Sequence, residues 1–157
     1  MSDLEEIEAI KQLKYRYLRA VDLKLWDLLE STFAPDAVAA YDGGNNSYQG
    51  RDAIVGWLRS AMDNEIITLH QVHHPEIELT SPTTAKGTWY LEDRVINSGS
   101  DLPEMPGHSI LSGAAFYSDE YVKIDGSWKI SLTGYERTYM EIRKHETPST
   151  FYSRWQA

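Results

Sequence analysis

Residues 109–142, with the sequence SILSGAAFYSDEYVKIDGSWKISLTGYERTYMEI, contain two long segments in which apolar and polar side chains alternate. Only Asp125 and Gly126 separate the two segments. This residue pair favours a tight β-hairpin turn, because both positions of such a turn require a positive φ. The pattern therefore predicts antiparallel strands over residues 109–124 and 127–142.

The sequence upstream of this hairpin divides into a helical half and a strand half. Residues 65–80 and 83–97 also alternate and predict two more long strands, whereas apolar residues at helical spacing predict helices over 4–21, 23–33 and 51–62. A short strand is expected at 36–41, followed by a loop at 42–47. Helices followed by antiparallel strands are typical of an α+β fold, in which the helices pack across one face of a curved antiparallel sheet.

The composition limits the classes of function. The chain has 157 residues, a formal net charge of −9 and no cysteine, so disulfides and thiol nucleophiles are excluded. No cluster of Lys and Arg is present, which argues against nucleic-acid and anionic-membrane partners. The acidic start of the chain lacks the features of a signal peptide, so we expect a cytoplasmic protein. We expect one domain over 1–157, with its core over about 7–142 and a tail over 143–157.

Asp93 is an unusual residue within the strand predicted at 83–97. The odd positions of this strand, from Ala85 to Val95, form an apolar face, and Asp93 is its only charged member. A buried carboxylate must be paired, hydrogen-bonded, protonated or directed into a cavity. The alternative is that Asp93 lies beyond the buried part of the strand, at a solvated rim.

The segment His70-Gln71-Val72-His73-His74-Pro75 contains three histidines. Pro75 suggests a β-bulge, which places His70 on the same inner face as Ile77 and Leu79 and leaves His73 facing outward. Because His70 and His73 then point to opposite faces and no cysteine is available, a metal site is not favoured. His70 is either a functional group or a core histidine bonded to the backbone.

Tyr17 and Asp22 lie near the end of the first predicted helix. Asp22 could cap the helix expected from residue 23, and Tyr17 could belong to the core. With His70 and Asp93, however, they provide the phenol, carboxylate and imidazole groups that proton transfer in an apolar pocket requires. No phosphate-binding glycine loop and no nucleophile elbow are present, so we expect acid–base chemistry without a cofactor or metal.

Several segments carry a family resemblance. They are IKQLK at 10–14, DLKLWD at 22–27, HPEI at 74–77, GTWYLED at 87–93, GAAFY at 113–117, KIDGSW at 123–128 and TGYER at 133–137. With these segments the chain resembles the SnoaL-like branch of the nuclear-transport-factor-two-like superfamily, and within it the bile acid 7α-dehydratases. The resemblance implies a cone-shaped, cystatin-like fold around a deep pocket. The loop at 97–108 is longer and richer in Gly and Pro than the family pattern, and we expect it to close over this pocket and to alter the choice of substrate.

The resemblance also implies a set of catalytic residues, which are Tyr17, Asp22, His70, Asp93 and Arg137. Position alone makes Arg137 an exposed strand cation, unless Gly134 forms a bulge that turns it inward. Candidate walls for a flat apolar ligand are Trp89, Tyr117 and Tyr135, although each could equally be a core residue. Arg137 could bind an anionic group of the substrate or neutralise a carboxylate.

The expected activity is that of a cofactor-independent dehydratase acting on a hydroxylated, carbonyl-activated steroid, bile-acid-like or other polycyclic substrate. His70 would be the base and Asp22 would orient it, while Tyr17 and a protonated Asp93 would donate hydrogen bonds. The alternatives are a ketosteroid isomerase or polyketide cyclase using the same pocket, or a ligand-binding module without chemistry. Aromatic residues in the tail, together with the resemblance, lead us to expect a homodimer or homotrimer; they are Phe151, Tyr152 and Trp155.

Overall fold

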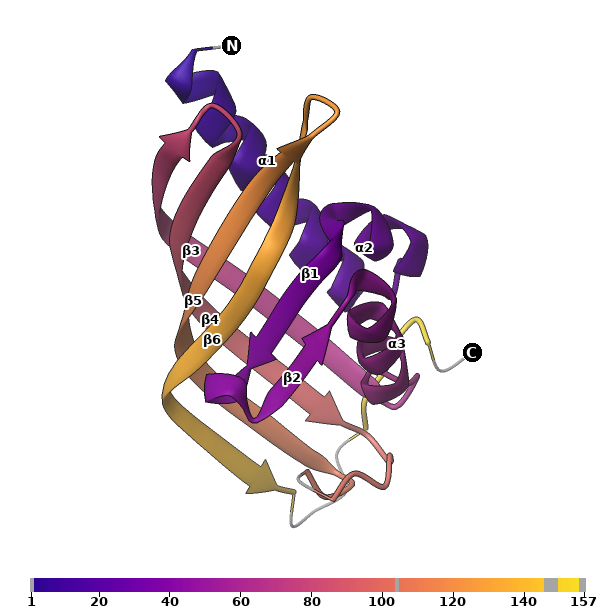
Figure 1. Ribbon diagram of the computed structural model, residues 1–157. Helices are drawn as coiled ribbons and strands as arrows, with labels where there is room; N and C mark the ends of the chain where they lie inside the picture. Colours follow the sequence, from indigo (N-terminus) through magenta and orange to yellow (C-terminus); the bar gives the residue numbers. More distant parts are fainter. Residues whose placement is uncertain (1, 104, 146–149, 156–157) are drawn as a thin grey trace.

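The computed structural model describes residues 2–103, 105–145 and 150–155. Its main helices lie against one face of a strongly curved sheet (Figure 1). The elements are, in chain order, α1 (Asp3–Asp22), α2 (Trp26–Thr32), β1 (Phe33–Tyr41), β2 (Asn46–Gln49), α3 (Arg51–Ala61), β3 (Ile66–Ser81), β4 (Thr84–Asn97), β5 (Ser109–Ile124) and β6 (Ser127–Lys144), with a short 3₁₀ turn at Asp42–Gly44. The predicted α+β class is therefore confirmed.

The two N-terminal helices begin in different ways. α1 begins with a capping box, in which Ser2 and Glu5 exchange side-chain and backbone hydrogen bonds. α2 begins at Trp26, later than predicted, and Leu25 precedes it without a side-chain cap. The prediction that Asp22 caps this helix is wrong, because Asp22 is the last residue of α1 and its carboxylate is used elsewhere.

The sheet has the strand order β2-β1-β6-β5-β4-β3. Neighbouring strands run antiparallel except β1 and β6, which are parallel, so the sheet is mixed rather than purely antiparallel as predicted. β2 lies partly in the segment predicted as a loop. The predicted hairpin turn is present, and its two residues, Asp125 and Gly126, have φ values of 48° and 78°.

Bulges determine which side chains face inward. In β3, His73 pairs with Tyr90 and Glu76 with Thr88, so the expected bulge at Pro75 is present. In β6 the register shifts twice, and neither shift falls at Gly134. The Gly134 prediction is therefore wrong: a Cβ there would lie 2.5 Å from the Ala40 carbonyl oxygen, so this glycine instead allows β1 to approach β6 closely.

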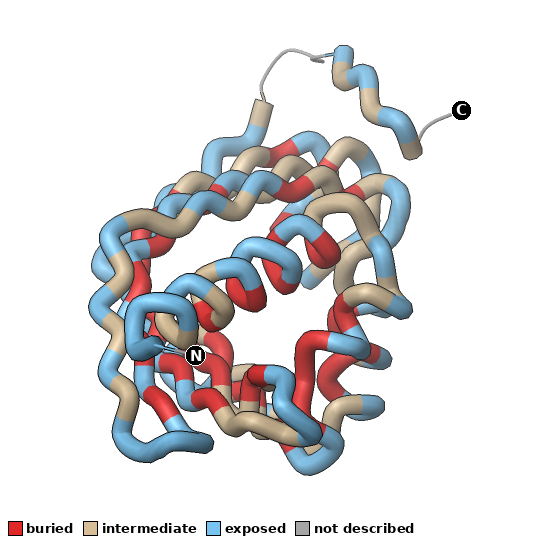
Figure 2. The backbone as a smooth tube through the Cα atoms, turned by 90° about the horizontal axis from the view of Figure 1, so that it is seen from above, coloured by how far each residue is buried: buried red, intermediate tan, exposed pale blue. Residues whose placement is uncertain are grey.

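The core lies between α1 and the concave face of the sheet. Figure 2 shows that buried residues recur along the helices and alternate with exposed and partly exposed residues along the strands. None of the helices in the described part of the chain is long and apolar enough to span a membrane. Together, α1 and the curved sheet form a cone, and its inner face presents the side chains of α1, β1, β3, β4, β5 and β6.

Candidate functional site

Asp22 and His70 form a tightly bonded pair. The Asp22 Oδ1 atom lies 2.6 Å from His70 Nδ1, and Asp22 Oδ2 accepts the His70 backbone N–H at 3.0 Å. The Thr68 hydroxyl also donates to Asp22 Oδ1, at 2.8 Å. Because the carboxylate holds Nδ1 as a donor, His70 Nε2 carries the lone pair and can act as a base.

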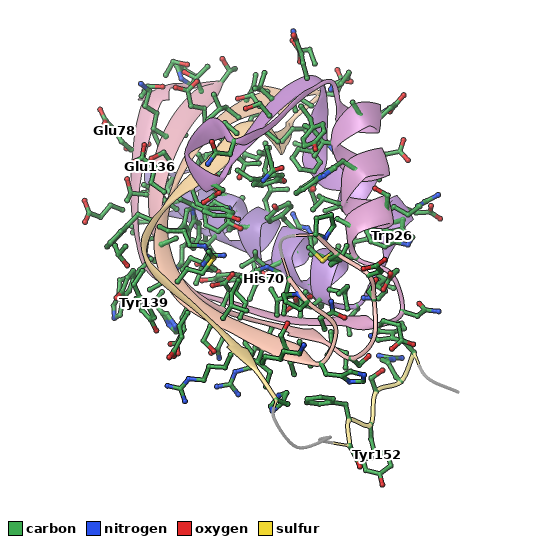
Figure 3. All side chains as sticks on the ribbon, turned by 90° about the horizontal axis from the view of Figure 1, so that it is seen from below. Trp26, His70, Glu78, Glu136, Tyr139 and Tyr152 are labelled. Carbon is green, nitrogen blue, oxygen red and sulfur yellow. The ribbon has the colours of Figure 1, made fainter. Side chains whose placement is uncertain are left out.

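His70 faces the interior of the cone, as predicted. It lies opposite Asp93 in the β3–β4 register, and after the bulge Ile77 returns to the same face opposite Gly87. His73 lies opposite Tyr90 on the outer face and is half-buried. Figure 3 shows His70 on the inner side of the sheet, while Glu136 and Tyr139 lie on its outer side. Within the described residues, no three His, Asp or Glu side chains are grouped in a way that could hold a metal ion.

An internal cavity of about 50 Å³ lies beside His70. Its walls are mostly aromatic and aliphatic side chains; they are Tyr17, Leu18, Val21, Tyr41, Trp57, Leu58, Met62, His70, Tyr117 and Tyr135. The loop at 97–108 does not line this cavity in the described part of the chain, contrary to expectation. Since Asp22 bonds Nδ1 but does not line the cavity, Nε2 is the imidazole nitrogen on the cavity side.

Phenol groups dominate the polar lining of the cavity. The Tyr17 and Tyr41 hydroxyl oxygens are 3.0 Å apart, and the rings of Tyr117 and Tyr135 meet edge to face. Burial raises the pKa of Tyr17, Tyr41 and Tyr117 well above the ordinary value, and that of Tyr135 is also raised, mainly by burial. These groups are therefore neutral hydrogen-bond donors near neutral pH.

Two of the three predicted wall residues, Tyr117 and Tyr135, line the cavity. Trp89 does not line it: the indole is fully buried and donates its N–H to the Tyr121 hydroxyl at 2.8 Å. Its large apolar face packs into the core, so Trp89 is a structural residue. Tyr41 was missed in the sequence, because its strand gave only a short pattern that did not show which way the ring points.

Asp93 is paired with Arg137. Arg137 Nη1 and Nη2 donate to the two carboxylate oxygens of Asp93 at 2.7 and 2.8 Å. A bidentate pair of this kind uses an ionised carboxylate as acceptor, so the expected role of Asp93 as a protonated donor is wrong. Arg137 is turned inward because the bulge near Ser131 shifts the β6 register, which places Arg137 opposite the buried Ala115.

A second buried ion pair escaped the sequence-based interpretation. Lys14 Nζ lies 2.7 Å from Asp119 Oδ2, and neither side chain is exposed. Asp119 also accepts hydrogen bonds from Tyr121 and Thr133, and Lys14 Nζ lies 3.3 Å from the centroid of the Tyr117 ring. Both residues could have been found from the sequence pattern, because Lys14 interrupts the apolar stripe of α1 and Asp119 occupies the inner face of β5.

A larger cleft of about 770 Å³ lies on the other side of the His70–Asp22 pair. It is lined by α1, by β3 and by the tail; the lining residues are Tyr15, Leu18, Arg19, Asp22, Leu23, Ile67, Thr68, Leu69, His70, Gln71, Val72, His73, Tyr152, Ser153, Arg154 and Trp155. Leu18 and His70 line both the cleft and the cavity. His70 therefore lies in the wall between the two spaces.

Comparisons with known proteins agree with this architecture. The family described as SnoaL-like domain matches residues 2–133. A candidate scytalone dehydratase from Novosphingobium aromaticivorans is 21% identical, with a TM-score of 0.76 over 96% of this chain and 92% of that chain. A hexachlorocyclohexane dehydrochlorinase (LinA) of type 2 is 23% identical, with a TM-score of 0.77 over 98% of this chain and 99% of that chain. An uncharacterised cystatin-like protein from Caulobacter vibrioides is 18% identical, with a TM-score of 0.71 over 86% and 91%.

Proposed function

The chain belongs to the SnoaL-like domain family, and from this membership and the His70 site we propose that it is a cofactor-independent lyase. The proposed reaction removes water from a hydroxylated, carbonyl-activated substrate. The observation that carries the proposal is the His70–Asp22 pair, whose free imidazole nitrogen lies on the side of a phenol-lined cavity. Two relatives are named for a dehydratase and a dehydrochlorinase activity, and both are eliminations.

In the proposed mechanism His70 Nε2 takes a proton from the carbon next to the carbonyl, or from its vinylogous position. The electron pair of that C–H bond forms the new double bond, and the C–O bond to the hydroxyl group breaks. The imidazolium returns its proton to the departing hydroxide, so one water leaves and His70 is regenerated. Asp22 stabilises the imidazolium and keeps the ring in the productive tautomer.

The remaining polar groups have separate roles in this proposal. Tyr17, Tyr41 and Tyr117 are neutral donors that can stabilise the enolate oxygen or the departing hydroxide. Arg137 is bonded to Asp93, which lies opposite His70 in the β3–β4 register, and its remaining N–H groups can bind an anionic oxygen of the substrate. The resemblance to bile acid 7α-dehydratases favours a steroid-like substrate.

The proposal is tested by incubating the protein with a 7-hydroxy-3-oxo-4-ene steroid and following the absorbance of the conjugated dienone. Mass spectrometry should show the loss of one water, whereas a product of unchanged mass would indicate an isomerase instead. His70→Ala and Asp22→Asn should each lower kcat by about 10²–10⁴-fold.

His73→Ala is the matched control, because His73 is a half-buried histidine of the same strand that faces outward. This variant should keep the wild-type rate. The proposal fails if neither the steroid nor simpler β-hydroxy ketones lose water, or if His70→Ala is as active as the wild type. A stable ligand complex without any turnover would indicate a binding module.

A further inference from the structure

The cavity beside His70 is lined by both buried and partly exposed side chains. Six of its lining side chains are at most 5% exposed; they are Tyr17, Leu18, Val21, Tyr41, Leu58 and Tyr117. The other four are only partly buried; they are Trp57, Met62, His70 and Tyr135. These four side chains therefore form the mouth of the cavity, with the proposed base among them.

Three of the four mouth residues are held by their neighbours. His70 is bonded to Asp22, and the Tyr135 ring contacts the rings of Tyr41 and Tyr117. Trp57 is stacked on Tyr41 and Tyr48, with ring centroids 5.4 and 4.8 Å away. The mouth is therefore rigid on these three sides.

Met62 differs from the other mouth residues. It is the C-cap of α3, where the backbone leaves the helical conformation with φ −109° and ψ 59°. Its unbranched thioether chain has three rotatable bonds and no hydrogen bond to keep it in place. Met62 is thus the mouth residue that can change rotamer at the lowest cost.

Because the cavity is small, the rotamer freedom of Met62 affects which substrates can enter it. A cavity of about 50 Å³ accommodates a water-sized group but not a ring system. A ring-bearing substrate reaches His70 Nε2 only if one wall moves. Resting on the proposed function, we propose that Met62 is a specificity-determining residue, whose side chain closes the cavity and whose displacement admits fused-ring substrates.

The test uses fluorescence titration with 2-naphthol, a neutral fused-ring probe that needs no turnover. Met62→Ala should bind 2-naphthol at least about tenfold more tightly than the wild type, because the probe no longer displaces the thioether. Met62→Trp should abolish binding, whereas Met62→Leu, which conserves the volume, should bind like the wild type. The same order is expected for turnover of the steroid relative to that of a single-ring β-hydroxy ketone.

Two matched variants separate this inference from its alternatives. Met140→Ala removes a thioether that is 53% exposed on β6, and it should leave binding unchanged. Tyr15→Ala alters the cleft but not the cavity; if it changes binding and Met62→Ala does not, the substrate enters from the cleft and the inference is overturned. It is also overturned if all Met62 variants bind like the wild type. If binding shifts as expected but no variant eliminates water, the proposed reaction fails while the role of Met62 stands.

Discussion

Lys14 and Asp119 form an ion pair in the interior of the cone, where neither side chain is exposed to solvent. The Asp119 carboxylate has three partners, since Lys14, Tyr121 and Thr133 all contact it. Burial lowers the pKa of Lys14, and the Coulombic attraction and hydrogen bond of Asp119 oppose this change. Each charge is tolerated only because the other is present.

Replacing Lys14 alone should therefore be costly. We expect Lys14→Met to lower the free energy of unfolding by about 3–5 kcal/mol, because Asp119 is left buried without a counter-charge. The double variant Lys14→Met/Asp119→Asn should recover much of this loss, since no unpaired charge remains. Urea unfolding measures all three proteins.

Lys11→Met provides the control on the same helix. Lys11 pairs with Glu8 at the surface, and loss of such an exposed pair changes stability by at most about 1 kcal/mol. Equal losses for Lys11→Met and Lys14→Met would contradict the ion-pair interpretation.

Single residues were predictable from sequence where one simple rule applied. Asp93 was found because it is a charge on an apolar strand face, and His70 because Pro75 implied a bulge. For Asp22 the local pattern alone offered helix capping, because its actual partner, His70, is distant in sequence, and only the family resemblance paired the two residues. Lys14 was missed because the helical stripe was traced through its apolar members only.

At the scale of elements, the pairing of β5 with β6 leaves a space that the Arg137 guanidinium occupies. A Cβ at Gly113 of β5 would lie 2.5 Å from Arg137 Nη1 and 2.9 Å from the Tyr139 carbonyl oxygen. The missing side chain therefore leaves the space in which Arg137 reaches Asp93. Gly113 therefore avoids a steric clash that any side chain at this position of the strand would cause.

Gly113→Ala should displace Arg137 and destabilise the fold by about 1–3 kcal/mol. If Arg137 binds an anionic group of the substrate as proposed, the affinity for that substrate should fall as well, because the guanidinium no longer keeps its position on Asp93. Thermal unfolding provides the measurement of stability, and KM that of binding.

Gly56→Ala is the opposite case, because Gly56 lies within α3 and a Cβ added there would meet open space. This change should stabilise the protein by about 0.5–1 kcal/mol. A neutral effect of Gly113→Ala would show that β5 and β6 can separate without cost.

The boundaries of the long elements were predicted to within a few residues. Which strands pair with one another in the sheet was only partly predictable. The strands β3 to β6 follow from alternation and from the Asp125-Gly126 turn, because these signals are local. The parallel pairing of β1 with β6 joins distant segments, and no local pattern reports it. The bulges in β6 could not be predicted from the sequence either, because no proline or glycine at the bulge positions requires them.

At the scale of the whole molecule, the buried phenols should make the fold sensitive to alkali. The unfolded chain loses tyrosine protons near pH 10, whereas Tyr17, Tyr41 and Tyr117 keep theirs in the folded protein because their pKa values are raised. The unfolded state therefore binds fewer protons above this pH. Stability is retained below about pH 10 and falls as the pH rises further, by up to about 1.4 kcal/mol per pH unit for each phenol.

Tyrosine absorbance near 295 nm and circular dichroism measure this effect together. Exposed tyrosines such as Tyr139 and Tyr152 should ionise first, in the folded protein. The buried phenols should ionise only as the protein unfolds, so the remaining rise in absorbance should coincide with the change in circular dichroism. Lys14 contributes in the opposite direction, because its pKa is lowered, but it is a single group. Ionisation of all tyrosines before unfolding would contradict the expected burial.

Self-association stays a prediction. Tyr152 is 94% exposed, and on the outer face of the sheet the rings of Tyr90 and Phe116 stack while remaining 39% and 45% exposed. Such apolar surface favours contact with another copy of the chain. Light scattering after size-exclusion chromatography should give a dimer or trimer mass, and Phe116→Ser should shift it toward the monomer.

The parallel contact between β1 and β6 has a consequence for biosynthesis. Val38 pairs with Leu132, so a nascent chain on the ribosome cannot pair β1 with β6 until the residues of β6 have left the exit tunnel. Tyr41 and Tyr135, which meet across this contact, come together only then. The cavity beside His70 is thus completed only after β6 has been synthesised, and chains that lack β6 expose an unfinished apolar surface to chaperones and proteases.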